Sequence, residues 1–414
     1  MRQAVATLGN GVPSPCTPRS ARRRFGAAGP ILAKRASRAL LLALLAPAVL
    51  TLPASRADAQ PLRPTRDSWP VFRGDSGLSG ASPSTLPVRP RLVWSFTTGG
   101  PIKSSPVAGG GRVYVGSSDG FLYCLQLATG KKLWAAKAGS PVEAPPLLDG
   151  DTVYVGTLEG TLLALEASSG RRRWAFKTGG RIAGSANVFR SGGKAGVLVG
   201  SYDGLLYALD AARGRLLWTY QTQNFINGAP AVLGNLAVFG GCDARLHLLS
   251  TLDGRQAGEV DTGAYIPGSA AAAGGRAYVG NYDGRLAAVD LGSGRVLWDY
   301  RNDQEGGAFF SSPAVGSGFV VIGGRDGRLH CVEAASGKRR WVYAAGAEVD
   351  SSPLIAGDAV LFGSADGRLT AVALKDGGER WSTEVGEPIS SSPALASGLV
   401  LVGCDDGRLY AFGE

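Results

Sequence analysis

Apolar and polar residues alternate over short segments that end at glycine-containing turns, and this pattern recurs along most of the chain. The stretch 200–218, GSYDGLLYALDAARGRLLW, contains one full example. An apolar strand end is followed by a Tyr-Asp-Gly turn, a second strand, an Arg-Gly turn and a third strand that reaches tryptophan. Alternation with a period of two is typical of β-strands that bury one face, and Asp-Gly favours a two-residue hairpin. The pattern predicts antiparallel β-sheet.

The same pattern occurs eight times. The acid of its hairpin recurs at intervals of 40 to 44 residues, at Asp119, Glu159, Asp203, Asp243, Asp283, Asp326, Asp366 and Asp406. Four short strands per repeat and a period of about 40 residues are typical of a β-propeller. We therefore predict an all-β fold, an eight-bladed β-propeller of four-stranded antiparallel blades, over residues 91–414.

The ends of the repeat array complement each other. Residues 91–97, RLVWSFT, match the tryptophan-containing end of a repeat but precede the first complete repeat, whereas the last repeat lacks this strand. Pairing of 91–97 with the C-terminal blade would remove an exposed sheet edge. We expect this N-terminal strand to close the ring.

A tryptophan follows the hairpin acid by fifteen residues in six repeats, and the strand 91–97 supplies a seventh. The fourth repeat has Gly258 at this position. We interpret the tryptophans as structural residues that pack between neighbouring outer strands. They are Trp94, Trp134, Trp174, Trp218, Trp298, Trp341 and Trp381.

Residues 1–59 have the order of a secretory leader. Basic residues at 34–38 precede an apolar run at 39–52 and the small residues Ala-Asp-Ala at 57–59, which predicts cleavage near Ala59–Gln60. The run is short for a membrane span, and no cysteine follows it to form a lipobox. We expect a periplasmic protein with no transmembrane helix in the mature chain. The arginines at 22–24 leave the choice between Sec and Tat export open.

The net charge of +10 is concentrated in this leader, which contains nine basic residues and one acid. The remaining chain has 34 basic and 32 acidic residues, a net charge of +2. A basic surface is the electrostatic requirement for binding nucleic acid without sequence preference. The composition therefore argues against a nucleic-acid partner.

Residues 60–90 form a lead segment rich in Pro, Ser and Arg. Its apolar stretch WPVFRG, at 69–74, is expected to dock on the outside of the array. The cysteines that follow the leader have no paired metal spacing, and we interpret them as buried small apolar residues. A disulfide between Cys124 and Cys404, in neighbouring repeats, stays open.

The third and fourth strands of four repeats read ALEASSGRRRW at 164–174, ALDAARGRLLW at 208–218, AVDLGSGRVLW at 288–298 and CVEAASGKRRW at 331–341. They resemble the tryptophan-docking motif of the pyrroloquinoline-quinone (PQQ) repeat family, and the resemblance covers residues 91–414. That family includes quinoprotein dehydrogenases, which bind PQQ with calcium. It also includes non-enzymatic propellers, typified by the propeller lipoprotein of the outer-membrane β-barrel assembly machine.

The dehydrogenases carry long insertions and adjacent cysteines, and this sequence has almost none of the former and none of the latter. The resemblance therefore favours a non-enzymatic periplasmic scaffold without a cofactor. Such a scaffold would be a monomer that binds envelope proteins, among them outer-membrane assembly components. The alternatives are a small PQQ- and calcium-dependent dehydrogenase and a propeller that senses another small ligand.

Comparison of the repeats with one another identifies positions that vary. One residue per repeat, just after the apolar residue of the loop between blades, should surround the mouth of the central channel: Lys103, Glu143, Ala183, Asn227, Pro267, Phe310, Asp350 and Ser390. Glu143, Asn227 and Asp350 carry the oxygen ligands that calcium prefers. The dehydrogenase resemblance implies that these three would bind calcium and that Lys103 would pair with a PQQ carboxylate.

A second varying position follows the hairpin. Five consecutive blades have arginine there, and a neighbouring arginine adds to a basic crescent: Arg245, Arg285, Arg325, Arg328, Arg368 and Arg408. These arginines either pair with nearby turn acids or bind an acidic segment of a partner. The loop 301–310, RNDQEGGAFF, is longer than its equivalents, and Phe309 and Phe310 in it are candidate partner contacts.

The two histidines of the chain, His247 and His330, share one repeat position, where other blades have tyrosine. They lie two blades apart and are predicted to replace tyrosine in packing rather than to bind a metal. The sequence contains no nucleophile–base pair, phosphate-binding loop or zinc pattern.

Overall fold

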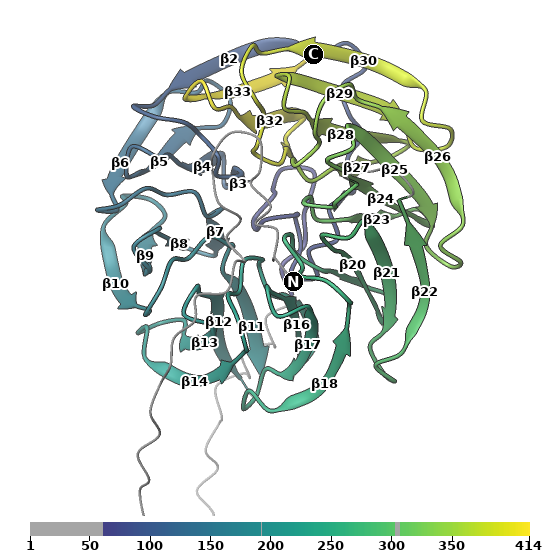
Figure 1. Cartoon of the computed structure of the whole chain (residues 1–414). Helices are drawn as coiled ribbons and strands as arrows, with labels where there is room; N and C mark the ends of the chain where they lie inside the picture. The colour runs from purple at the N-terminus through teal and green to yellow at the C-terminus, as the bar shows by residue number, and fades with distance from the viewer. Residues whose placement is uncertain (1–60, 192, 303–306) are drawn as a thin grey trace, which may run out of the picture. The chain divides into compact units, whose positions relative to one another are not determined.

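The computed structural model describes residues 61–191, 193–302 and 307–414. Eight four-stranded antiparallel sheets lie in a ring around a central axis (Figure 1). The prediction of an eight-bladed all-β propeller is confirmed. None of the described residues forms a helix, and so none provides a helix long and apolar enough to cross a membrane.

Each blade runs from an inner first strand to an outer fourth strand. Blade 1 contains β3 (Val107–Gly109), β4 (Arg112–Gly116), β5 (Phe121–Gln126) and β6 (Lys132–Lys137). Blade 2 contains β7 (Leu147–Asp149), β8 (Thr152–Gly156), β9 (Thr161–Glu166) and β10 (Arg172–Lys177). Blade 3 contains β11 (Asn187–Ser191), β12 (Lys194–Gly200), β13 (Leu205–Asp210) and β14 (Leu216–Gln221). Blade 4 contains β15 (Ala231–Leu233), β16 (Leu236–Gly240), β17 (Arg245–Ser250) and β18 (Gln256–Asp261).

The second half of the ring repeats this order. Blade 5 contains β19 (Ala271–Ala273), β20 (Arg276–Gly280), β21 (Arg285–Asp290) and β22 (Val296–Arg301). Blade 6 contains β23 (Ala314–Gly316), β24 (Phe319–Gly323), β25 (Arg328–Glu333) and β26 (Arg339–Ala344). Blade 7 contains β27 (Leu354–Ala356), β28 (Ala359–Gly363), β29 (Arg368–Ala373) and β30 (Glu379–Glu384), and the short strand β1 (Ala81–Ser82) pairs with β27. Blade 8 contains β31 (Ala394–Ala396), β32 (Leu399–Gly403), β33 (Arg408–Gly413) and β2 (Arg91–Thr97).

The last blade takes its outer strand from the N-terminal side of the chain. β2 pairs with β33 in antiparallel register, from Arg91 opposite Gly413 to Thr97 opposite Arg408. Without β2, the edge of β33 that faces away from β32 would be exposed to solvent. The predicted closure of the ring is confirmed.

Alternation within the strands distributes side chains between two neighbouring cores. In β4, Val113 and Val115 pack with residues of blade 8, whereas Tyr114 between them packs with residues of blade 2. Successive side chains of a strand point to opposite faces of the sheet. Each blade therefore fills the space on both of its sides, and the hydrophobic core is divided among the contacts between blades.

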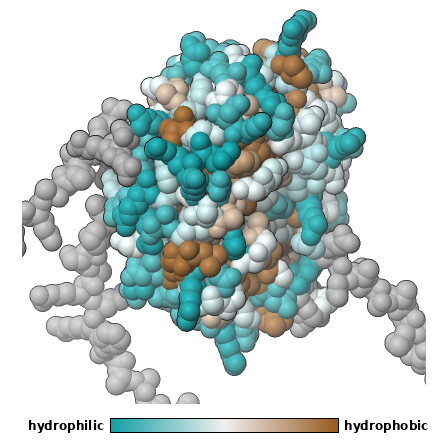
Figure 2. Space-filling model, turned by 90° about the vertical axis from the view of Figure 1, so that its right-hand side faces the viewer, coloured by the Kyte–Doolittle hydropathy of each residue, from teal (hydrophilic) through white to brown (hydrophobic). Residues whose placement is uncertain are grey.

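The fourth strands form the outer surface of the ring and are exposed at their first residues. Leu216 of β14 is 51% exposed, and similar apolar residues begin the fourth strands of other blades. Figure 2 views the side of the ring that carries β22 and β26, where hydrophobic side chains form separate patches among hydrophilic ones. Isolated apolar residues on a surface are ordinary.

A tryptophan connects neighbouring blades at seven of the eight contacts between them. The indole Nε1 of Trp134, for example, donates a hydrogen bond of 3.1 Å to the carbonyl oxygen of Ala167, and its ring lies on Gly170. A Cβ at Gly170 would lie 2.7 Å from the ring, and the positive φ of 72° there also favours glycine. We expected the indoles to pack between neighbouring outer strands. Six of the seven lie instead on the turn between the third and fourth strands of the next blade.

The lead segment lies at the centre of the ring, not on its outside as the sequence suggested (Figure 1). Trp69 is only 2% exposed. In six blades the N–H of the middle residue of the first strand donates to a carbonyl of this segment. The pairs are Ala108 to Trp69, Leu148 to Pro70, Val232 to Ser76, Ala272 to Gly77, Val315 to Ser79 and Ile355 to Gly80.

The position of the lead segment has a physical reason. Within its blade, each first strand pairs with the second strand only, so its other edge presents backbone N–H groups toward the axis. Buried N–H groups without partners are costly, and an extended segment of the same chain supplies the carbonyls. A periodicity analysis could not find this, because the segment has no repeat of its own.

Arg73 fastens the segment at the axis. Its buried guanidinium donates to the carbonyl oxygens of Ser352 at 3.1 Å and Pro313 at 3.2 Å. Burial lowers the pKa of Arg73 to about 9, and the nearby Asp75 carboxylate opposes this shift. Gly80 lies against the guanidinium, and a Cβ at Gly80 would overlap it.

Candidate functional site

The mouth of the central channel is the principal candidate site. All eight residues that we predicted around it line one cavity of about 190 Å³. They come from the loops between blades, and the 40-residue repeat brings equivalent loop positions together around the axis. Phe72 of the lead segment also lines this cavity.

Serine side chains form the wall of the cavity and link the blades. In five successive blade contacts a backbone N–H donates to the Oγ of the serine one repeat later, at 2.8 to 3.0 Å. The pairs are Ala229 to Ser269, Ser269 to Ser312, Ser312 to Ser352, Ser352 to Ser392 and Ser392 to Ser105. The cavity wall is therefore polar and held by hydrogen bonds between blades.

The charged residues at the mouth are paired with one another. The Lys103 ammonium lies 3.9 Å from a carboxylate oxygen of Glu143. Arg325 donates to both carboxylate oxygens of Asp350, at 3.0 and 2.7 Å, and its guanidinium lies 3.4 Å from the centre of the Phe310 ring. Burial acts to lower the pKa of Arg325, but Asp350 outweighs it and the pKa rises.

These contacts bear on the predicted calcium and PQQ site. Glu143, Asn227 and Asp350 line the same cavity, but Arg325 engages both oxygens of Asp350. Among the described residues, no group of three or more His, Cys, Asp or Glu side chains could hold a metal ion. The cavity is also smaller than the roughly 300–1,000 Å³ of typical sites for organic ligands. The donor set as arranged does not fit calcium with PQQ.

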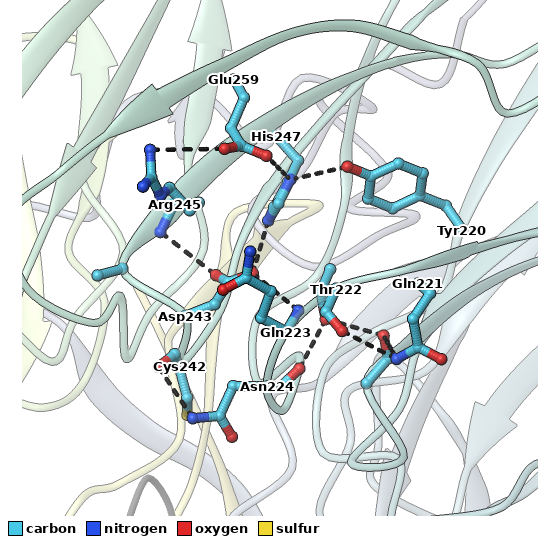
Figure 3. A network of polar contacts seen from close by, with 12 residues as sticks. Tyr220, Gln221, Thr222, Gln223, Asn224, Cys242, Asp243, Arg245, His247 and Glu259 are labelled. Atoms are coloured by element: carbon cyan, nitrogen blue, oxygen red, sulfur yellow. Dashed lines mark hydrogen bonds and ion pairs between the residues drawn. The ribbon is translucent and has the colours of Figure 1, made fainter. Parts of the chain in front are cut away.

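In several blades, hydrogen bonds occupy the acid of the hairpin turn. In blade 4, Asp243 accepts a hydrogen bond from His247 at 2.9 Å (Figure 3). The other ring nitrogen of His247 faces Tyr220 at 3.4 Å and Glu259 at 3.5 Å. Burial alone would raise the pKa of Asp243, but its hydrogen bond to His247 lowers it on balance.

Other blades use the same contact with tyrosine in place of histidine. Tyr123 donates to Asp119 at 2.7 Å, and the equivalent tyrosines of blades 3 and 8 do the same. His330 lies 3.1 Å from Asp326 and is buried like His247. The prediction that the histidines replace tyrosine in packing is confirmed.

Acids neutralise much of the basic crescent. Arg245 pairs with Glu259 and Asp261, and Arg285 pairs with Asp299 at 2.9 Å. Most of these acids lie on the adjacent fourth strand, not in the hairpin turn. Arg368 contacts both kinds, Asp366 in the turn and Glu384 on the strand. In the described part of the chain no ion pair involves Arg328 or Arg408.

The two phenylalanines of the long loop differ in position. Phe309 is fully buried and packs edge-on against His330, so the expectation that it contacts a partner is wrong. Its place is that of the apolar loop residue which every blade buries. Phe310 is half-buried at the channel mouth. Residues 303–306 of this loop lie outside the described residues.

Aromatic residues beside the mouth were missed by the sequence analysis. Tyr265 stacks on Tyr282 with ring centres 4.4 Å apart, and Tyr282 contacts Phe310 at 5.9 Å. Tyr202 stacks on Phe225 at 5.2 Å. The residue before each hairpin acid would have revealed them, because it is tyrosine in blades 3 and 5 and small or polar in several others.

Cys124, Cys331 and Cys404 are free and buried. The disulfide between Cys124 and Cys404 that the sequence left open is not formed. Burial raises the pKa of each of these three thiols to about 12, which suppresses the reactive thiolate. The interpretation of these three cysteines as small buried apolar residues is confirmed.

Solved structures with the same fold include both classes that the sequence indicated. BamB from Moraxella catarrhalis shares 19% identity over 79% of this chain and 98% of that chain, with a TM-score of 0.67. The quinohemoprotein alcohol dehydrogenase from Comamonas testosteroni shares 16% identity over 87% of this chain and 82% of that chain, with a TM-score of 0.72. At such identities these likenesses show the fold alone.

Comparison with curated proteins finds no match. A protein-family model described as outer membrane protein assembly factor BamB matches residues 89–195, 185–308 and 301–413. These segments together span the whole propeller and most of the chain. The protein therefore belongs to the family of the outer membrane protein assembly factor BamB.

Proposed function

We propose that the protein is a non-enzymatic periplasmic scaffold that binds envelope proteins during outer-membrane protein assembly. The match of residues 89–413 to the BamB family carries this proposal. The contacts at the channel mouth support it as well, because Arg325 engages both carboxylate oxygens of Asp350, which a calcium site would need as a ligand.

The periplasmic location is part of the proposal. It rests on the leader at 1–59 and its cleavage near Ala59–Gln60, which lie outside the described residues. The buried free thiols are compatible with that compartment, because burial keeps them protonated and unreactive.

The face that carries the hairpin turns would bind the partner. Within the crescent, Arg328 and Arg408 form no ion pair with an acid of the described residues, and Phe310 lies half-buried on the same face. Cations that are not neutralised locally attract an acidic segment and accelerate its association. We expect these residues to contribute to binding without being needed for folding.

The first experiment asks whether the protein serves outer-membrane assembly in its own host. Deletion of the gene should lower the amount of β-barrel proteins in the outer membrane, and the tagged full-length protein should co-purify with assembly components. In the deletion strain, the double variant Arg328→Glu and Arg408→Glu should restore the amount of outer-membrane β-barrel proteins less well than the wild-type protein does. The matched control is Arg285→Glu, which breaks the ion pair with Asp299. Unchanged outer-membrane composition in the deletion strain would contradict the proposal.

The PQQ- and calcium-dependent dehydrogenase is the second candidate. One observation favours it, namely that Glu143, Asn227 and Asp350 line the same cavity. Calorimetric titration of PQQ with calcium into the purified protein separates the two candidates. Saturable binding at micromolar concentration that is lost in Glu143→Gln would favour the dehydrogenase, and no heat is expected from a scaffold. Binding of another small ligand at this cavity would favour the third alternative, a propeller that senses a small molecule.

A further inference from the structure

One of the eight contacts between blades lacks its tryptophan. Where blade 4 meets blade 5, Gly258 of β18 stands in place of the indole. The glycine that an indole would cover is Gly294, in the turn after β21. A Cβ placed on Gly294 would have no heavy atom within 4 Å, whereas a Cβ on Gly254, at the contact before it, would lie 2.5 Å from the Trp218 ring. The surface of Gly294 is uncovered.

The hydrogen-bond acceptor of this contact is also unused. At the preceding contact Trp218 donates to the carbonyl oxygen of Thr251 at 3.2 Å. The equivalent carbonyl in blade 5 belongs to Leu291, and no hydrogen bond reaches it within the described residues. An uncovered glycine and an unused carbonyl are the two features that an indole contacts at each of the complete contacts within the ring.

Leu248 fills only the inner part of the vacant position. It is the strand neighbour of Gly258 and is buried. The seven other blades have a smaller residue at this place: Cys124, Ala164, Ala208, Ala288, Cys331, Ala371 and Ala411. A Cβ on Gly258 would meet Leu248 at an ordinary distance of 3.8 Å, so the leucine lies beneath the missing ring and does not extend over Gly294.

Exposed apolar residues follow Gly294 in the chain. Val296 and Leu297 begin β22, two and three residues after this glycine, and both are exposed.

We propose that the contact between blades 4 and 5 is a docking site for a tryptophan side chain of another protein. The indole ring would lie on Gly294 and its N–H would donate to the carbonyl of Leu291, as six indoles of this chain do at equivalent positions. A tryptophan that is buried at an interface commonly contributes a large share of the binding energy.

The tryptophan has to come from a different protein. The chain has eight tryptophans, of which seven dock between blades and Trp69 is buried at the axis, and none precedes Trp69. A second copy of the chain therefore has no tryptophan to donate. The identification of the partner as an envelope protein rests on the proposed function. The binding of an indole at the contact between blades 4 and 5 does not depend on that function.

Titration of 5-fluoroindole, observed by fluorine NMR, tests the dock itself. Wild-type protein should bind one equivalent with saturation in the millimolar range, and the variant Gly258→Trp with Leu248→Ala, which rebuilds the usual contact, should lose this binding. Gly258→Trp alone serves if the double variant does not fold. Trp218→Gly creates the same vacancy between blades 3 and 4 and should add a second equivalent. No saturable binding to wild type would overturn the proposal.

Crosslinking in cells tests the partner. A photoreactive phenylalanine at Leu297 should give an adduct whose partner peptide contains tryptophan, and the same residue at Val342, on β26, is the control. Fluoroindole binding without such an adduct would overturn the assignment of a protein partner. The two proposals can fail separately. Fluoroindole binding and a tryptophan-containing adduct would support the docking site even if deletion of the gene left the outer-membrane composition unchanged. That last result would contradict only the proposed function.

Discussion

The indole Nε1 of Trp381 donates a hydrogen bond of 3.2 Å to the carbonyl oxygen of Pro87, which lies 294 residues earlier in the chain. At the other complete contacts the acceptor belongs to the turn before the fourth strand of the next blade. Blade 8 has no such turn, because its fourth strand is β2. The residues just before β2 take over the role of the turn, and the N–H of Val88 also donates to Glu414 at 2.8 Å.

Removal of β2 should open the ring. Deletion of residues 91–97 exposes the edge of β33 and removes Trp94, so we expect the melting temperature to fall sharply. Appending ATGRLVWSFT after Glu414 in the deletion variant should restore most of the loss, because the strand then follows β33 through a copy of the turn 128–130 of blade 1. Calorimetry measures both, and an unchanged melting temperature in the deletion variant would contradict the role of β2.

The indole contacts should contribute strongly to stability. Trp341→Ala removes a buried ring and its hydrogen bond to Leu374, and we expect it to lower the free energy of unfolding by about 3–5 kcal/mol. Trp341→Phe keeps an aromatic ring but loses the hydrogen bond, at a cost of about 1–2 kcal/mol. The neighbouring Val342→Ala should change stability by less than about 0.5 kcal/mol. Urea unfolding distinguishes these values, and equal losses for the tryptophan and valine variants would refute the argument.

The packing of the lead segment at the axis should require glycine at position 80. Gly80→Ala places a methyl group against the Arg73 guanidinium at a φ of +68°, so we expect overpacking to cost about 1–3 kcal/mol beyond the backbone strain. Gly110→Ala is the matched control, because its φ is +60° and its Cβ would meet no heavy atom within 4 Å. Limited proteolysis should cut within 61–90 earlier in the first variant than in the second.

Stability should fall in alkaline solution, partly because of the buried thiols. Burial raises the pKa of Cys124 and Cys331 from about 9 to about 12, so the unfolded chain loses these protons first as the pH rises. Their contribution is complete below pH 9 and is lost between pH 9 and 12. The double variant Cys124→Ala and Cys331→Ala should show a smaller loss between pH 8 and 10.5 in urea unfolding.

Alanine is a suitable replacement in that experiment because other blades have it at this repeat position, for example Ala164 and Ala208. Tyrosines with raised pKa values, such as Tyr410, leave a residual loss in the variant. The same pH dependence in both proteins would show that the thiols titrate alike in the folded and unfolded chain.

The fold could be predicted because its signal is repeated. Eight hairpin acids and seven tryptophans indicate the same strand order in each repeat, and the position of strand 91–97 before the first repeat indicates how the ring closes. The lead segment could not be placed, because Trp69 and Phe72 look like any apolar cluster, and the ring of N–H donors that binds them exists only after the blades assemble.

The sequence predicted where the residues of the candidate site lie, but not which of their charged side chains form ion pairs. Equal spacing placed Lys103, Glu143 and Asp350 at one mouth, and the cavity confirms it. The pairing of Asp350 with Arg325 depends on side-chain directions in two neighbouring loops, which spacing alone does not determine. The burial of Phe309 could not be predicted for the same reason, because the side chains of adjacent loop residues point in opposite directions.

The lead segment also determines what the axis of the propeller can do. Phe72 lines the cavity at the mouth, and its neighbour Arg73 hydrogen-bonds to Ser352 and Pro313 at the axis. The wall of this cavity is therefore not built by the repeats alone. A change in the lead segment would alter the channel mouth without touching any blade.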